Sequence, residues 1–367
     1  MSQSSSSEFH EGFARAALQI HLKTVLHGHN MSVDAVHFTP DGRLLASIAT
    51  DGIRIWDVSE GTLQAQIDEV FPMGADFSLR NNYIAAVVEG GIVRVWTIDG
   101  MRIIDLPGHE VKASGTAFSP TGSLLVTGDG TGKVRVWDVG TWQLLCSFQG
   151  GPHGDIEPPT RSLPGATDLT FSPDGEYVAM RSQDSYGVVQ VWRIADTTGP
   201  GCAEWVGAVG EPHRMTWPLA FSPDGRFLAV PVNGPDVIWL FESQSWALAG
   251  ILSIPGNETA KSISFSPDGH FLAAAGGLSG VVWFWEILNQ QLIGSFEAHT
   301  EGYSPWAQEW AIGGIDWARN SRLLATSGMS HGTLFDSQQQ RYLGPPDYTI
   351  KIWEVNLLRG SGSSINV

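Results

Sequence analysis

Short apolar runs alternate with turn sequences along the chain, and one turn sequence recurs with little change. It reads Phe-Ser/Thr-Pro-Asp/Thr-Gly at 38–42, 118–122, 171–175, 221–225 and 265–269, with weaker copies at 77–81 and 317–321. Ser or Thr opens a type I turn, Pro presets φ at the second position, and Gly suits the fourth. An apolar run follows each copy, as at 44–46 and 227–229. Each copy therefore predicts a β-hairpin.

A second segment follows each hairpin, and its alternating β-branched residues predict a third strand. Each third segment contains an aromatic anchor: Trp56, Trp96, Trp137, Trp192, Phe241, Trp285 and Trp353. A fourth apolar run comes next, for example at 62–67, 143–148 and 291–296. Successive anchors are 40, 41, 55, 49, 44 and 68 residues apart. The shorter intervals match a four-stranded blade of about 40–45 residues, and the longer ones indicate insertions.

These repeats resemble the WD-repeat family over roughly residues 19–355. The resemblance rests on Trp56-Asp57 and Trp137-Asp138, with Gly28-His29 and Gly108-His109 ahead of their repeats. It implies an all-β fold, a seven-bladed β-propeller of four-stranded antiparallel blades. Residues 18–26 match a lone fourth strand, so they are expected to complete the last blade and close the ring. One propeller is expected over 18–357, between flexible tails at 1–17 and 358–367.

In that family a hydrogen-bonded set of His, Ser or Thr, Asp and Trp pins each blade. The resemblance implies two full sets, one in the first blade and one in the last: His29, Ser47, Asp51, Trp56; and His299, Thr326, Asp347, Trp353. The third blade keeps His109 and Trp137, but Thr131 occupies the region expected for Asp. The other blades lack a convincing set, which indicates a diverged propeller that relies more on packing. His29 and His109 are therefore interpreted as structural rather than metal-binding.

Composition and motifs exclude several functions. Twenty-one basic residues against thirty-eight acidic ones give a net charge of −17, which disfavours nucleic acid and favours solubility or a basic peptide. The sequence has no P-loop, dinucleotide fingerprint, zinc pattern or serine-nucleophile motif, so no catalytic residue, cofactor or metal is expected. It also has no membrane-length apolar run. Its Ser-rich first residues are interpreted as a flexible tail rather than a signal peptide. Cys146 and Cys202 are interpreted as packed thiols in a reducing compartment, the cytoplasm or a eukaryotic nucleus.

Three insertions carry the residues best suited to recognition. They lie at 150–164, 297–311 and 329–346. In the family such connections share one face, called the top, and the last two should be neighbours beside the seventh blade. Aromatic residues mixed with Arg and His suit binding hot spots. The predicted partner-binding residues are Tyr303, Trp306, Trp310, His331, Phe335, Arg341 and Tyr342, together with Arg161 and Arg214.

Other readings of these positions stay open. Trp306 and Trp310 are four residues apart, which also fits one face of a short helix covering the blade edge. Arg214 and Lys261 are expected near the top mouth of the channel, where solvated charges are common.

Two functions follow from these features. The first is a non-catalytic scaffold that binds a protein or peptide through its top face, as a monomer or a subunit of a hetero-complex. The alternative is a propeller enzyme, because the repeated Ser-Pro-Asp-Gly turns also resemble those of lactonases and related hydrolases. That enzyme would require a channel lined by converging His, Asp and Glu side chains.

Overall fold

A computed structural model describes most of the chain. The described residues are 17–68, 73–78, 80–107, 109, 113–150, 166–182, 188–195, 201–210, 218–232, 236–256, 258–276, 279–299, 311–319, 322–329, 334–336, 341–343 and 347–358. These residues form thirty strands and no helix. No segment among them has the helical length and apolar character that crossing a membrane requires.

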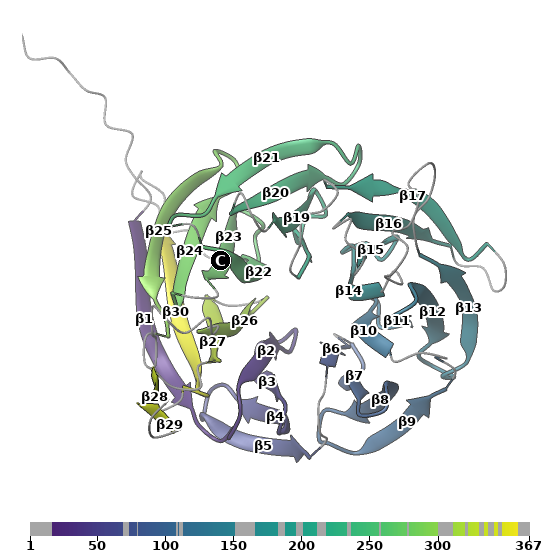
Figure 1. The fold of residues 1–367 in the computed structure, drawn as a ribbon, viewed down its shortest axis with the longest axis horizontal. Helices are drawn as coiled ribbons and strands as arrows, with labels where there is room; N and C mark the ends of the chain where they lie inside the picture. Colours follow the sequence, from purple (N-terminus) through teal and green to yellow (C-terminus); the bar gives the residue numbers. More distant parts are fainter. Residues whose placement is uncertain are drawn as a thin grey trace, which may run out of the picture.

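Seven blades, numbered in chain order, each contain four strands that run outward from the ring centre (Figure 1). The innermost strands are β2 (Val33–Phe38), β6 (Met73–Phe77), β10 (Ala113–Phe118), β14 (Ala166–Phe171), β18 (Ala220–Phe221), β22 (Ala260–Phe265) and β26 (Ile312–Trp317). The second strands are β3 (Leu44–Ala49), β7 (Tyr83–Val88), β11 (Leu124–Asp129), β15 (Tyr177–Ser182), β19 (Phe227–Val232), β23 (Phe271–Gly276) and β27 (Leu323–Gly328). The third strands are β4 (Gly52–Asp57), β8 (Ile92–Thr97), β12 (Lys133–Asp138), β16 (Val189–Ile194), β20 (Val237–Glu242), β24 (Val281–Glu286) and β30 (Ile350–Leu358). The outermost strands are β5 (Thr62–Ile67), β9 (Arg102–Leu106), β13 (Leu144–Gln149), β17 (Ala203–Val209), β21 (Leu248–Ser253), β25 (Gln291–Glu297) and β1 (Ala17–Leu26).

The ring closes through the first strand of the sequence. β1 pairs antiparallel with β30, with Ala17 opposite Leu358 and Leu26 opposite Ile350. Figure 1 shows β1 on the outside of β30, and the blade-seven sheet runs β1-β30-β27-β26. The predicted seven-bladed propeller, closed by its N-terminal strand, is confirmed.

The recurrent turn has the geometry that its sequence predicts. In blade five, Ser222 Oγ donates to Asp224 Oδ1 at 2.6 Å and accepts from the backbone N–H of Phe227 at 2.9 Å. Gly225 N–H donates to the Ser222 carbonyl, and its φ of 71° is one that glycine adopts without strain. The turn therefore fixes the register of β18 against β19.

Packing between blades explains the aromatic anchors. One buried apolar cluster fills each seam between neighbouring blades. In every seam the third-strand anchor of one blade packs against the preceding blade; Trp56, for instance, lies with Ile350 and Ile352 of blade seven. Trp285 is only 1% exposed. Because half of each core belongs to the neighbouring blade, a single blade could not bury its own apolar surface.

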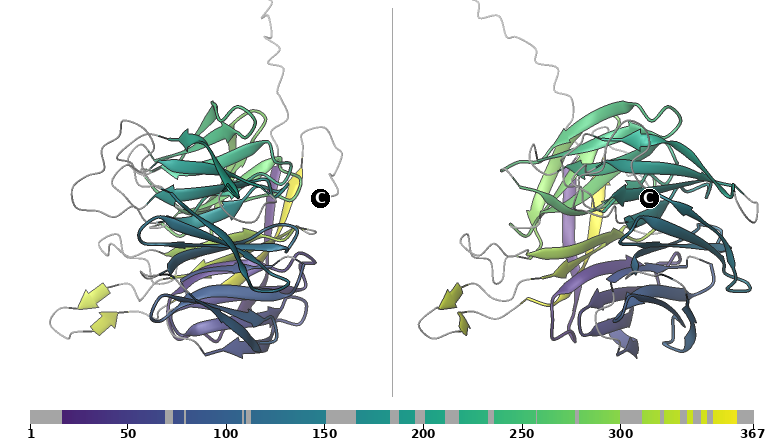
Figure 2. Two further views of the ribbon diagram at one scale, coloured as in Figure 1. Left: turned by 90° about the vertical axis from the view of Figure 1, so that its right-hand side faces the viewer. Right: turned by 45° about the vertical axis from the view of Figure 1, so that its right-hand side comes forward.

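The two faces of the ring differ in their connections. Because the strands are antiparallel, first-to-second and third-to-fourth turns lie on the bottom face. Second-to-third connections and those between blades lie on the top face. The second-to-third connection of blade seven contains a separate hairpin, β28 (Leu334–Asp336) with β29 (Arg341–Leu343). Both views in Figure 2 show this hairpin standing clear of the blades.

The two cysteines correct the expectation of separate packed thiols. Cys146 and Cys202 form a disulfide, with their Cα atoms 6.4 Å apart. Cys146 lies on β13 of blade three, and Cys202 immediately precedes β17 of blade four. They are 56 residues apart in sequence, and the ring brings the two outer strands together. Sequence spacing did not reveal this because the two cysteines belong to different repeats.

Candidate functional site on the top face and in the channel

Most of the predicted partner-binding residues lie outside the described residues. These are Tyr303, Trp306, Trp310, His331, Arg161 and Arg214. The other three, Phe335, Arg341 and Tyr342, belong to the β28–β29 hairpin. In its register Phe335 lies opposite Tyr342, and Asp336 lies opposite Arg341. The hairpin is therefore the part of the predicted top-face site that the structure describes.

Irregular pairing at the top of the innermost strands shapes the channel mouth. The register shifts between Val33 and Ala35, between Thr167 and Leu169, and between Ala260 and Ser262. The extra residues are Asp34, Asp168 and Lys261. A bulge of this kind bends the strand and re-aims a side chain. At Asp168 the backbone adopts a left-handed φ of 44°, which is uncommon outside glycine.

The bulge residues make the top mouth a ring of mixed charge. Burial lowers the pKa of Lys261, whereas the charges of Asp34 and Asp168 raise it. These three residues come from blades six, one and four, which are not neighbours, so they interact across the channel. Arg181 Nε also lies 2.7 Å from Asp168 Oδ2. A ring that contains both positive and negative side chains favours one orientation of a charged partner segment. It does not strongly attract partners of one particular charge.

Farther down the channel, carboxylates on two innermost strands, β6 and β26, link those strands to the next blade. Asp76 Oδ2 accepts the backbone N–H of Phe118 at 2.6 Å, and Asp316 Oδ2 accepts that of Phe38 at 2.7 Å. Burial raises the pKa of both carboxyl groups, and the charge of nearby His37 opposes that rise. All three residues directly precede the aromatic of the repeated turn. The channel is therefore polar at this level, but the carboxylates of Asp76 and Asp316 accept backbone hydrogen bonds from the next blade.

Among the described residues, three blades contain a relay of hydrogen-bonded polar side chains. In blade one, Trp56 Nε1 donates to Ser47 Oγ at 2.8 Å, and Ser47 Oγ lies 2.7 Å from His29 Nε2. Ionised Asp51 can only accept, so His29 Nδ1–H donates to Asp51 Oδ1 at 2.6 Å, and Nε2 of the neutral ring accepts from the Ser47 hydroxyl. Blade seven repeats the relay. Its members are Trp353, Thr326, His299 and Asp347.

Blade three corrects the assignment of Thr131. Trp137 Nε1 donates to Thr127 Oγ1 at 2.9 Å, Thr127 Oγ1 lies 2.7 Å from His109 Nε2, and His109 Nδ1 lies 2.9 Å from Asp129 Oδ2. The carboxylate is thus Asp129, at the end of β11. Thr131 instead donates to Asp129 Oδ1 from both its N–H and its hydroxyl. Asp347 and Thr349 interact in the same way, so the shared Asp-x-Thr spacing was the signal in the sequence.

In blades one and three the environment lowers the pKa of the relay histidine, and in all three relays it lowers the pKa of the aspartate, which stays ionised. Burial lowers the pKa of His29 to about 4, although the hydrogen bond to Asp51 opposes this shift. Burial alone would raise the pKa of Asp347, but hydrogen bonds from His299 and Thr349 outweigh it, and the pKa falls to about 2. Both ring nitrogens of each relay histidine are hydrogen-bonded within the blade, so these histidines have a structural role. Within the described ranges, no group of three or more His, Cys, Asp and Glu residues is arranged to hold a metal ion.

Comparison with known proteins agrees with this architecture. The family described as "WD domain, G-beta repeat" matches residues 20–57, 100–138 and 251–286. Each matched segment includes outer-strand residues of one blade and ends in the third strand of the next. The sequence repeat and the blade are therefore offset by one strand, which is the same offset that closes the ring.

Curated relatives align with parts of the chain. The U3 small nucleolar RNA-associated protein 21 homolog of Schizosaccharomyces pombe is 29% identical over 42% of this chain and 16% of its own length. The small ribosomal subunit protein RACK1y of Oryza sativa subsp. japonica is 32% identical over 32% of the chain and 38% of its own. The target of rapamycin complex subunit wat1 of S. pombe is 23% identical over 62% and 69%. The chain therefore contains three repeats that match this WD family, within a β-propeller of seven four-stranded blades.

Proposed function

We propose that this protein is a non-catalytic WD-repeat scaffold that binds a protein or peptide partner through its top face. The observation that carries the proposal is the β28–β29 hairpin, which stands clear of the ring on that face (Figure 2). A two-stranded hairpin is marginally stable by itself, so an additional partner would stabilise it. The names of the relatives support this role, since they include a ribosomal subunit protein and a complex subunit.

The proposed contact surface combines the hairpin with the channel mouth. Phe335, Arg341 and Tyr342 provide aromatic and cationic groups on the hairpin. Tyr303, Trp306, Trp310, His331, Arg161 and Arg214 are retained as proposed contacts from the neighbouring connections. A basic partner segment fits the net charge of −17 and would meet Asp34 and Asp168 at the mouth. The protein would act as a monomer or within a hetero-complex. The cytoplasmic location predicted from free thiols loses that basis, because Cys146 and Cys202 form a disulfide.

Proximity labelling and affinity purification would identify a partner, and matched variants would then locate its site. Replacing 331–343 with a Gly-Ser linker, or combining Phe335→Ala with Tyr342→Ala, should remove the partner while the ring stays folded. Leu63→Ser is a suitable control, because Leu63 is an exposed apolar residue on the outer strand β5. If Leu63→Ser lost partner binding while the hairpin variants kept it, a top-face site would be contradicted.

The hydrolase alternative has one specific observation in its favour, the position of His37 near Asp76 and Asp316 in the channel. Both carboxylates, however, accept backbone N–H groups of the next blade. We therefore assign them to ring packing. Turnover of lactone or ester substrates that disappears in His37→Ala, with the melting temperature unchanged, would replace the scaffold proposal with an enzyme.

A further inference from the structure

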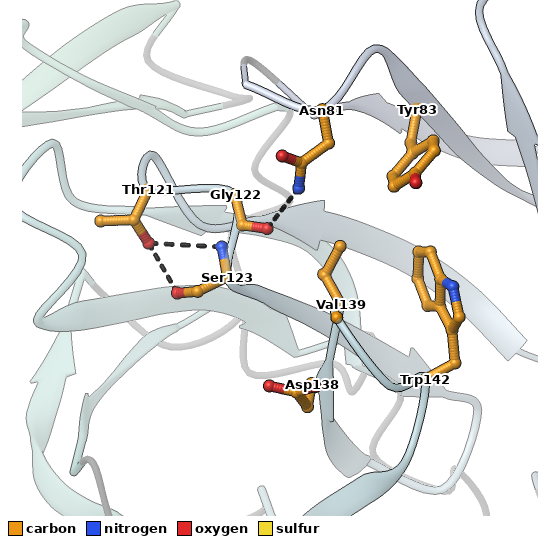
Figure 3. A pocket seen from close by; sticks show the side chains of 9 residues that line it. Asn81, Tyr83, Thr121, Gly122, Ser123, Asp138, Val139 and Trp142 are labelled. Atoms are coloured by element: carbon orange, nitrogen blue, oxygen red, sulfur yellow. Dashed lines mark hydrogen bonds between the residues drawn. The ribbon is translucent and has the colours of Figure 1, made fainter.

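A hollow of about 540 Å³ lies at the seam between blades two and three (Figure 3). It is lined by residues of two turns in blade three and one turn in blade two: Asn81, Tyr83, Thr121, Gly122, Ser123, Asp138, Val139, Gly140 and Trp142. Its turns are first-to-second and third-to-fourth connections, so the hollow lies on the bottom face, opposite the hairpin. Its volume falls within the range of small-ligand sites, about 300–1,000 Å³.

An unusual tryptophan forms part of one wall. Trp142 lies four residues after Asp138, in the β12–β13 turn, and its φ of 57° lies in the left-handed region. In blade one the same turn position is Gly61, with a φ of 67°, and both residues donate their N–H to the carbonyl four positions earlier. Glycine suits this backbone, whereas a bulky residue is strained. The indole instead lies against Tyr83 of blade two, with ring centroids 5.5 Å apart.

The polar groups of the hollow are mainly acceptors. Asp138 Oδ1 accepts the N–H and the hydroxyl of Thr141, each at 2.7 Å, and the Thr141 hydroxyl in particular lowers the pKa of Asp138. Asn81 Nδ2 donates to the Gly122 carbonyl at 2.7 Å, which leaves the Asn81 amide oxygen as an acceptor. The Thr121 and Ser123 hydroxyls lie 2.7 Å apart. The lining includes no Lys or Arg.

We propose that this hollow binds an arginine side chain presented by a protein partner. A guanidinium is planar, cationic and rich in donors, so it can stack on Trp142 or Tyr83 while donating to Asp138 and Asn81. An acidic ligand would face a carboxylate with no basic residue in the lining to offset it. The net charge of −17 further favours a basic ligand. This site is independent of the proposed top-face function, because it lies on the bottom face and shares no residue with the proposed top-face surface.

The matching seam between blades four and five supplies a control. Trp246 occupies the same turn position with a φ of 56°, and its ring lies 5.5 Å from that of Tyr177. There the carboxylate beside the tyrosine, Glu176, lies 4.0 Å from Arg193 of its own blade. Trp246→Gly therefore removes the same inter-blade ring contact from a seam where a basic residue is already present.

Ligand-observed NMR titration of the full chain with N-acetyl-arginine methylamide tests the proposal. Saturable millimolar binding is expected, with at least tenfold weaker binding of the neutral citrulline analogue. Trp142→Gly should weaken arginine binding at least tenfold, and Asp138→Asn several-fold, because both remove direct contacts. Thermal melting checks that each variant is folded, and Asp138→Asn keeps an oxygen for Thr141.

Two control variants should bind the arginine probe like the unaltered protein. One is Trp246→Gly; the other is Asp57→Asn, which changes the corresponding turn carboxylate of blade one. Equal binding of the citrulline analogue, or equal losses in Trp142→Gly and Trp246→Gly, would overturn the proposal. Because no variant here alters the hairpin, loss of top-face partner binding would be a separate result.

Discussion

The carboxylate of Asp316 in blade seven accepts the backbone N–H of Phe38 in blade one, with an Oδ2–N distance of 2.7 Å. Their positions are 278 residues apart in the sequence, so this bond joins the two ends of the ring at its inner edge. The pairing of β1 with β30 joins them at the outer edge. Closure therefore combines a side-chain bond in the channel with a strand pair on the rim.

Asp316→Asn should leave the melting temperature unchanged or raise it, whereas Asp316→Ala should lower the free energy of unfolding by about 1–3 kcal/mol. Asn keeps an acceptor for Phe38 N–H, but Ala leaves that donor without its partner. Burial raises the folded pKa of Asp316, so the native state holds this proton more tightly and stability rises as pH falls through that pKa. Urea titrations at several pH values would test both effects, and a stable Asp316→Ala variant would contradict this role.

His29 should have the opposite effect: its contribution to the free energy of unfolding should be lost as pH falls from about 6.5 to about 4. The folded pKa is about 4 and the unfolded pKa is about 6.5, so the unfolded chain binds the proton first as pH falls. The stabilisation is complete above about pH 6.5, and its loss by pH 4 amounts to about 3 kcal/mol. His29→Gln should flatten the pH dependence, while His270→Gln, at an exposed site, should not. An unchanged slope in His29→Gln would refute the assignment.

Asp129→Ala should destabilise the protein more than Thr131→Val does. Asp129 accepts from His109, and its removal breaks the blade-three relay, at a cost of about 1–3 kcal/mol. Thr131→Val removes only one hydroxyl bond to Asp129 and keeps the backbone bond. Chemical denaturation of the two variants provides the comparison. A larger loss in Thr131→Val would favour the assignment made from sequence alone.

Reduction of the disulfide should lower stability without abolishing the fold. Closing a loop across 56 residues stabilises the native state by about 4 kcal/mol in the chain-entropy account. Both cysteines are buried, 7% and 3% exposed, so reduction should be slow in the folded state. Melting with and without reductant, beside the Cys146→Ser/Cys202→Ser double variant, would measure the effect. Equal melting temperatures in all three samples would show that the bond contributes nothing.

Much of the fold follows from local physics. The turn at 221–225 predicts its hairpin because Ser, Pro and Gly each favour one turn position, and the third-strand anchors follow at blade spacing. The lone strand at 18–26 predicted closure, since an unpaired outer strand and an incomplete last blade complement each other. The repeat alone indicated the region of Thr131, although Asp129 and Thr131 have the same Asp-x-Thr spacing as Asp347 and Thr349.

The sequence by itself determined the seven repeats, the closure and the relays of blades one and seven, because each depends on short patterns that repeat. Only the tertiary structure decided which distant groups meet. Cys146 meets Cys202, Asp316 meets Phe38, and Trp142 meets Tyr83 across seams between blades. Those encounters depend on how the blades curve into a ring, a relation between residues far apart in the chain that local patterns do not encode.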